Sequence, residues 1–184
     1  RWGAAGALWG YKMVVFGGNE GSNYFNDVWT LDLSSSTWSK MITLGTSPST
    51  RAYLRAIVYG DNMIIHGGWT GSSVKGDLWS LDLTTNTWAE ITFAAGTSIP
   101  TDRAATSVLL YGHNMIVFGG GSPAETWSLD LTTNTWSLLT LHTGSSQPSA
   151  RYDHNTVLYG DEMIAFGGQN GGSTRYNDLW SLPL

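Results

Sequence analysis

The chain has 184 residues, a formal net charge of −5 at pH 7 and no cysteine, which excludes disulfides and thiolate metal sites. Its three lysines and six arginines do not cluster, so the sequence favours neither nucleic-acid binding nor a polybasic membrane surface. No apolar run approaches the roughly 18 residues of a membrane span, and we expect no signal peptide in "RWGAAGALWG". Low charge with ten tryptophans argues against disorder.

One phrase recurs along the chain at nearly constant spacing. Its four copies are "MVVFGG" (13–18), "MIIHGG" (63–68), "MIVFGG" (115–120) and "MIAFGG" (163–168). The Gly-Gly pairs lie 50, 52 and 48 residues apart, a period that indicates a repeat architecture. We predict a single domain over 1–184, built from the repeats 1–50, 51–102, 103–150 and 151–184.

Each repeat predicts four short strands, a to d, in the same order. An arginine precedes strand a, such as 106–111, and a tight turn of the "YGHN" kind leads into strand b, such as 115–118. Strand b is apolar at nearly every position, which predicts burial on both faces. Strand c, such as 77–83, alternates apolar and polar residues. A "TTN" or "SSS" turn then leads to strand d, such as 87–93, which opens with tryptophan.

Four antiparallel strands per repeat predict an all-β propeller with one blade per repeat and no helix. The last repeat ends at "SLPL", so its blade lacks the outermost strand, d. The first and last repeats are as apolar as the inner two, and terminal repeats normally need a covered face. Three arrangements stay open: four blades closing within one chain, a homodimer forming an eight-bladed ring, or a fragment of a longer protein.

The repeat resembles the kelch repeat. The resemblance rests on the Gly-Gly pairs, on the initial arginines, on His154 in "RYDH", and on tryptophan pairs nine residues apart (Trp29/Trp38, Trp79/Trp88, Trp127/Trp136), with Trp180 unpaired. It covers essentially the whole chain and implies a β-propeller without implying one activity. We expect the tryptophans to fill the space between blades. Asp32, Asp82 and Asp130 should bond backbone amides of the c–d turns.

In antiparallel blades the b–c and d–a loops share one end, which we call the loop face. These loops are the longer and more varied ones, where binding residues usually lie. On this face the b–c loops contribute Trp69 and Tyr176 as candidate ligand-binding residues. The resemblance implies that residues just after each repeat arginine line a binding basin. The further candidate ligand-binding residues are therefore Trp2, Tyr53, Arg55, Tyr152 and Asp153.

The initial arginines allow two interpretations, a ring that binds anions or braces that bind loop carbonyls and neighbouring carboxylates. We favour the braces. These arginines are Arg1, Arg51, Arg103 and Arg151.

We predict no enzyme and no cofactor. The four histidines (His66, His113, His142, His154) occupy different repeat positions without metal-ligand spacing. Galactose oxidase also has a kelch propeller, but its Tyr–Cys cofactor needs a cysteine. A sugar epimerase would need an acid/base pair, for which Glu20, Asp153 and His154 are the candidates.

The preferred function is a non-catalytic module that recognises a protein or peptide. The alternatives are a carbohydrate-binding or sugar-isomerising propeller, and a designed or excised scaffold without a natural ligand. The sequence predicts no cellular location.

Overall fold

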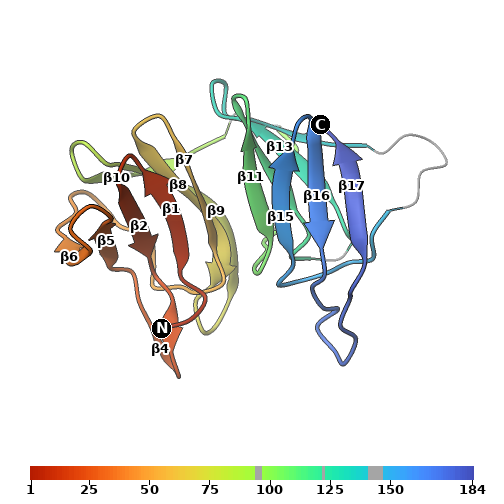
Figure 1. Ribbon diagram of the computed structural model, residues 1–184, viewed down its shortest axis with the longest axis horizontal. Coiled ribbons are helices and arrows are strands. Elements are labelled where there is room, and N and C mark those ends of the chain that lie inside the picture. The colour runs from red at the N-terminus through yellow and green to blue at the C-terminus, as the bar shows by residue number, and fades with distance from the viewer. Residues whose placement is uncertain (94–96, 122, 141–146) are drawn as a thin grey trace. The chain divides into compact units, whose positions relative to one another are not determined.

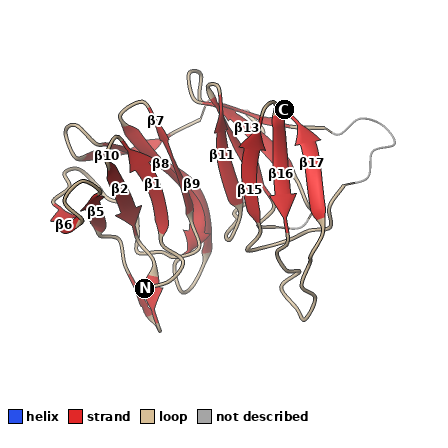
Figure 2. Cartoon of the chain, viewed as in Figure 1, coloured by secondary structure: helices blue, strands red, loops and turns tan. Residues whose placement is uncertain are grey.

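The structure of the chain, a computed structural model, describes residues 1–93, 97–121, 123–140 and 147–184. Every regular element in these residues is a β-strand, as the sequence predicts (Figure 2). Within the same residues no helix is long and apolar enough to span a membrane. The chain divides into two compact units, Arg1–Thr92 (unit 1) and Phe93–Leu184 (unit 2) (Figure 1).

Unit 1 contains two four-stranded antiparallel sheets, blade 1 and blade 2. Blade 1 has the strand order β1-β2-β5-β6, with the bounds Ala5–Trp9, Lys12–Phe16, Val28–Asp32 and Thr37–Met41. Blade 2 consists of β7 (Arg55–Tyr59), β8 (Asn62–Trp69), β9 (Val74–Asp82) and β10 (Thr87–Ile91). A small ribbon of β3 (Asn19–Glu20) and β4 (Asn23–Tyr24) extends the b–c loop of blade 1.

Unit 2 contains blade 3 and the three-stranded blade 4. Blade 3 consists of β11 (Ser107–Tyr111), β12 (Asn114–Phe118), β13 (Thr126–Asp130) and β14 (Thr135–Leu138). Blade 4 consists of β15 (Asn155–Tyr159), β16 (Glu162–Phe166) and β17 (Leu179–Pro183). The predicted order a-b-c-d is therefore confirmed, and so is the missing strand d of the last blade among the described residues.

The short turns of each blade lie together at the end opposite the loop face. The a–b turns are tight because a glycine takes the left-handed conformation, with φ of 59° at Gly60. In the c–d turn of blade 2, Asp82 Oδ1 accepts the amides of Thr84 and Thr85 at 2.8 and 3.1 Å. The amide of Leu83 donates to the carbonyl oxygen of Asp61 in the a–b turn at 2.8 Å. Asp32 and Asp130 make the same turn contacts, which confirms the predicted role.

The core of unit 1 lies between blade 1 and blade 2. Val14 and Phe16 of β2 pack there with Met63 and Ile65 of β8. Trp88 of β10 closes this core, with its ring centroid 5.1 Å from that of Phe16. In unit 2 an equivalent core joins β12 to β16. Its buried members are Leu109, Ile116, Phe118, Met163 and Ala165. Tryptophan between blades is thus confirmed for Trp88.

The apolar b strands are buried on both faces only in blades 2 and 3. Met63 to His66 in β8 and Met115 to Phe118 in β12 are buried at every position. In blade 1, however, Met13 is exposed, and Trp38 is 51% exposed whereas its counterpart Trp88 is 3% exposed. The expectation of two buried faces is therefore wrong for β2 in the chain alone.

Blade 4 exposes the opposite face of its sheet. Phe166 of β16 and Leu179 of β17 are 55% and 67% exposed. Their counterparts in blade 1, Phe16 and Val28, are buried against blade 2. Blade 1 therefore exposes the face that in blade 2 packs on the preceding blade, and blade 4 exposes the face that in blade 3 packs on the following one.

Candidate interaction surface

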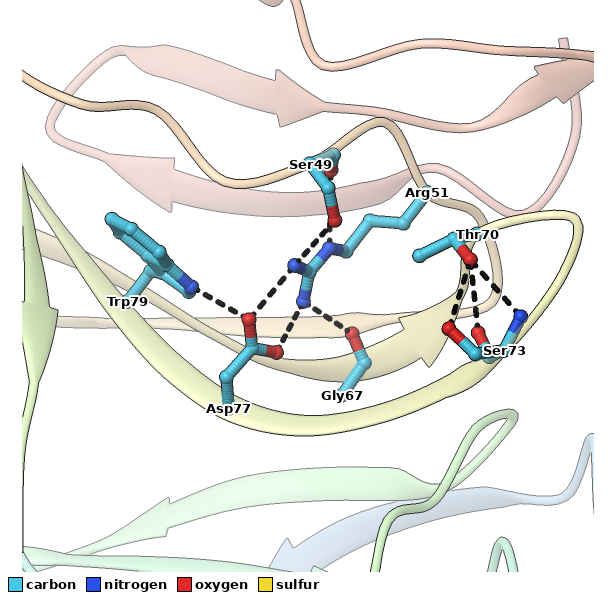
Figure 3. Close-up of polar contacts among 7 residues, drawn as sticks. All are labelled: Ser49, Arg51, Gly67, Thr70, Ser73, Asp77 and Trp79. Atoms are coloured by element: carbon cyan, nitrogen blue, oxygen red, sulfur yellow. Dashed lines mark hydrogen bonds and ion pairs between the residues drawn. The ribbon is translucent and has the colours of Figure 1, made fainter.

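An ion pair in each blade joins the segment that precedes strand a to an acidic residue at or near the start of strand c. In blade 2 the guanidinium of Arg51 binds both carboxylate oxygens of Asp77, with Nη2–Oδ2 at 2.9 Å (Figure 3). Arg51 also donates to the carbonyl oxygen of Gly67 at 3.1 Å and to Ser49 Oγ at 3.0 Å. The same carboxylate accepts the indole Nε1 of Trp79 at 2.8 Å. Because Arg51 is only 1% exposed, it acts as an internal brace.

The brace is repeated in the other three blades, which confirms the preferred interpretation of the initial arginines. Arg103 and Arg151 are buried as completely as Arg51, so these guanidiniums are not offered to an anion in solution. Each arginine also donates to the carbonyl oxygen of the first glycine of its Gly-Gly pair. The three sets are Arg1–Asp27–Trp29, Arg103–Glu125–Trp127 and Arg151–Asp178–Trp180.

The acidic partner of the brace is a structural residue that the sequence reasoning missed. Burial alone would raise the pKa of Asp77, but hydrogen bonds from Arg51 and Trp79 outweigh it and hold that pKa below its ordinary value. The hydrogen bond from Arg151 lowers the pKa of Asp178 strongly. In the sequence this acidic partner is visible as an acid two residues before the strand-c tryptophan, in "NDVW", "GDLW", "AETW" and "NDLW".

The residue two positions after each repeat arginine has a left-handed backbone. Its φ is 61° at Gly3, 57° at Tyr53, 53° at Ala105 and 54° at Asp153. These positions link neighbouring blades, since the Tyr53 amide donates to Gly3 O at 2.7 Å and the Asp153 amide donates to Ala105 O at 2.9 Å. A non-glycine residue in this conformation costs about 1–2 kcal/mol, which the surrounding hydrogen bonds must offset. The start of strand a is therefore a fixed rim.

Unit 1 brings three of the predicted site residues to its loop face. Trp2 is 66% exposed, and its amide pairs with the b–c loop residue Asn19 at 3.0 Å. Tyr53 is half-buried beside Gly3. Trp69 is half-buried, and its backbone pairs with the residue preceding Tyr53.

The fourth site residue predicted in unit 1 is Arg55, which begins β7 and is half-buried. Its Nη1 donates to Leu54 O at 3.1 Å.

Unit 2 carries the other three. The backbones of Tyr152 and Gln169 exchange hydrogen bonds of 2.8 and 2.9 Å. Asp153 is exposed, and its Oδ2 accepts Gln169 Nε2 at 2.9 Å. The ring of Tyr176 lies under the guanidinium of Arg151, whose Cζ is 4.5 Å from the ring centroid. Tyr176 thus also supports the brace of blade 4.

The structure describes three of the four histidines. His154 is buried, and its Nε2 lies 2.9 Å from Ser107 Oγ, while its ring packs edge-on against Phe118. His66 is buried in β8, and His113 is an exposed turn residue. His142 lies outside the described residues. Glu20, the remaining acid/base candidate, is exposed on β3. In the residues that the structure describes, no three acidic or histidine side chains are grouped so as to hold a metal ion.

Repeated antiparallel blades, each braced by an arginine, an acid and a tryptophan, define a β-propeller repeat protein. The chain belongs to the KLHDC2/KLHL20/DRC7 Kelch-repeats domain family, whose profile matches residues 1–123 and 94–184. A search of curated proteins found no match. Kelch domains typically serve as protein-interaction modules, which is the class of function that the family gives.

Proposed function

We propose that the chain is a non-catalytic interaction module that binds a protein or peptide on its loop face. The observation that carries this proposal is the exposed indole of Trp2 beside the fixed backbone at Gly3 and Tyr53. Large aromatic side chains on a braced backbone lose little entropy on binding. Tryptophan, tyrosine and arginine are also the residues enriched at interaction hot spots.

The proposed binding residues are taken unit by unit. Unit 1 carries Trp2, Tyr53, Arg55 and Trp69, and unit 2 carries Tyr152, Asp153 and Tyr176. In each unit the aromatic rings supply apolar contact area, and one charged side chain, Arg55 in unit 1 or Asp153 in unit 2, would orient a partner.

The test compares alanine variants at the loop face with a control at the other end of a blade. We expect Tyr53→Ala and Tyr152→Ala to weaken binding of a peptide selected by display by about tenfold or more, with the melting temperature unchanged. The third repeat supports Tyr53→Ala as a mild change, because Ala105 occupies the equivalent left-handed position. Tyr11→Ala removes an equally large aromatic that is 82% exposed in an a–b turn, and it should have no effect. Unchanged affinity in both loop-face variants would contradict the proposal.

A glycan array run with the same protein separates the carbohydrate alternative from the preferred one. Saccharide binding that Tyr53→Ala removes, without any selected peptide, would replace the proposed class of ligand. Binding of peptides and not of saccharides is the result that the proposal predicts.

We propose further that the exposed flanks of blades 1 and 4 are covered in the functional particle. Their exposed residues, such as Trp38 and Phe166, occupy positions that are buried where a neighbouring blade is present. Ring closure within one chain, a homodimer, or further blades of a longer protein would each provide this cover.

A further inference from the structure

The b–c loop of blade 4, between β16 and β17, has an exposed tip that carries an Asn-Gly pair (Figure 1). Asn170, Gly171 and Gly172 are all exposed in this tip. Of the asparagines in the chain, Asn170 alone precedes a glycine. Because glycine has no Cβ, its backbone nitrogen is open to the amide carbon of the side chain before it. This pair is therefore the place where the backbone of the chain can react with one of its own side chains.

The backbone holds the tip as a short hairpin. Gln169 pairs with Arg175, and the amide of Asn170 donates to the carbonyl oxygen of Thr174 at 3.3 Å. Gly171 lies at the turn with a φ of 85°, a conformation that residues with a side chain rarely adopt. The hairpin thus needs a glycine at the position that follows Asn170.

Both reacting groups are prepared by their surroundings. In the part of the chain that the structure describes, the amide of Gly171 donates to no other group, so no hydrogen bond has to break before its nitrogen attacks. The side-chain oxygen of Asn170, Oδ1, accepts the amide of Gly172 at 2.9 Å. This hydrogen bond strengthens as negative charge develops on Oδ1, and it therefore stabilises the transition state of an attack on Cγ.

We propose that Asn170 deamidates spontaneously in the folded protein. The nitrogen of Gly171 loses its proton to water and forms a bond with Cγ of Asn170. The bond from Cγ to the side-chain nitrogen then breaks, and this nitrogen takes up a proton and leaves as ammonia, so that a succinimide ring remains. Holding the two groups next to each other makes the attack intramolecular, which is the source of its speed.

One water molecule opens the succinimide in either of two ways. Attack of water on Cγ breaks the bond from Cγ to the Gly171 nitrogen and leaves an aspartate. Attack on the backbone carbonyl carbon of residue 170 breaks the bond from that carbon to the same nitrogen. This second route leaves an isoaspartate, in which the chain continues through the former side chain. Neither route requires an oxidant or a reductant.

The new carboxylate lies on the loop face of unit 2. A Cβ at Gly171 would lie 3.5 Å from Cε2 of Tyr152, so the tip is next to this aromatic ring. The neighbour of Asn170, Gln169, donates to the carboxylate of Asp153 at 2.9 Å. Since a carboxyl group of this kind is ionised at neutral pH, deamidation adds a negative charge to a surface that already carries one. Any effect of this charge on ligand binding rests on the proposed function, whereas the reaction itself does not.

The test follows residue 170 by mass spectrometry in the intact 184-residue chain at neutral pH. The peptide GGQNGGSTR, which copies residues 167–175, serves as a time reference in the same buffer. We expect the folded chain to exchange the side-chain amide for a carboxyl group at least as fast as the peptide does. No exchange in the folded chain after the peptide has converted would overturn the proposal. Aspartate without any isoaspartate would also overturn it, because the succinimide opens by both routes.

The chain contains its own control in the same tryptic fragment. Residues 152–175 include Asn155, which is exposed in β15 and is followed by Thr156 instead of glycine. We expect Asn155 to stay unchanged while Asn170 converts. Equal conversion at the two positions would overturn a role of the Asn-Gly pair.

Matched variants test the two prepared groups. Gly171→Ala places a Cβ beside the attacking nitrogen and should slow the reaction by roughly tenfold or more. Gly172→Pro removes the amide that donates to Oδ1 of Asn170, whereas Gly172→Ala keeps it, so the proline variant should react more slowly than the alanine variant. The rate in the native chain should rise with pH, because the attacking nitrogen has to lose its proton. An unchanged rate in Gly171→Ala, or a rate independent of pH, would contradict attack by this nitrogen.

Discussion

At the residue scale, the brace of arginine, acid and tryptophan holds the loop face in place. In blade 2 one carboxylate, that of Asp77, accepts hydrogen bonds from both Arg51 and Trp79. A buried guanidinium needs such a partner, because an unpaired buried charge costs several kcal/mol. The loops can therefore vary in sequence while the backbone beneath them stays fixed.

Removal of this arginine tests the brace. We expect Arg51→Ala to lower the free energy of unfolding by about 3–5 kcal/mol, because it leaves the partly buried Asp77 and the Gly67 carbonyl without their donor. Arg1→Ala is the matched control, since the Arg1–Asp27 pair is more exposed and should contribute about 1 kcal/mol or less. Urea denaturation measures both. Equal losses in the two variants would contradict a role of burial in the brace.

The aspartates of the c–d turns make a pH-dependent contribution to the stability of the folded state. Hydrogen bonds from Thr84 and Thr85 lower the pKa of Asp82 to about 2 from an ordinary 3.8. A carboxylate with a lowered folded-state pKa stabilises fully above its unfolded pKa, and this contribution is lost as the pH falls through the folded value. The melting temperature should therefore fall between about pH 4 and pH 2. The melting temperature of the Asp82→Asn variant should fall less over the same pH range. An identical fall in the two proteins would contradict this assignment.

At the element scale, the period, the four strands of a blade and the missing last strand could all be predicted, because each depends on local residue patterns. The acid of the brace could not be predicted, although "GDLW" and its counterparts repeat visibly. The reason is that acid and arginine are far apart in the sequence, 26 residues in the pair of Asp77 and Arg51. The left-handed backbone at Tyr53 carries no local signal, because tyrosine rarely adopts this conformation. The packing between blade 3 and blade 4 also needed the structure, because it joins residues of different repeats.

Burial between blades is tested on strand β10. Trp88 packs against Phe16 of the neighbouring blade, so Trp88→Ala should lower the free energy of unfolding by about 3–5 kcal/mol. Glu90→Ala alters an exposed side chain of the same strand and should change stability by less than about 0.5 kcal/mol. Thermal or urea unfolding of the two variants gives the comparison. A small effect of Trp88→Ala would show that the packing between blades 1 and 2 contributes little.

At the scale of the whole molecule, a comparison of equivalent positions in the repeats indicates which surfaces are covered in the assembled particle. Each blade buries one face against its neighbour, so a face that is exposed in blade 1 or blade 4 has a buried counterpart elsewhere in the same chain. Exposed apolar area of this kind marks an interaction surface. We therefore expect the particle in solution to be a closed ring, of one chain or of two.

Small-angle X-ray scattering with an absolute mass tests this expectation most directly. The account predicts a compact closed ring whose mass corresponds to one chain of 19.9 kDa or to two such chains. An elongated particle with the mass of a single chain, its flanks open to water, would contradict it.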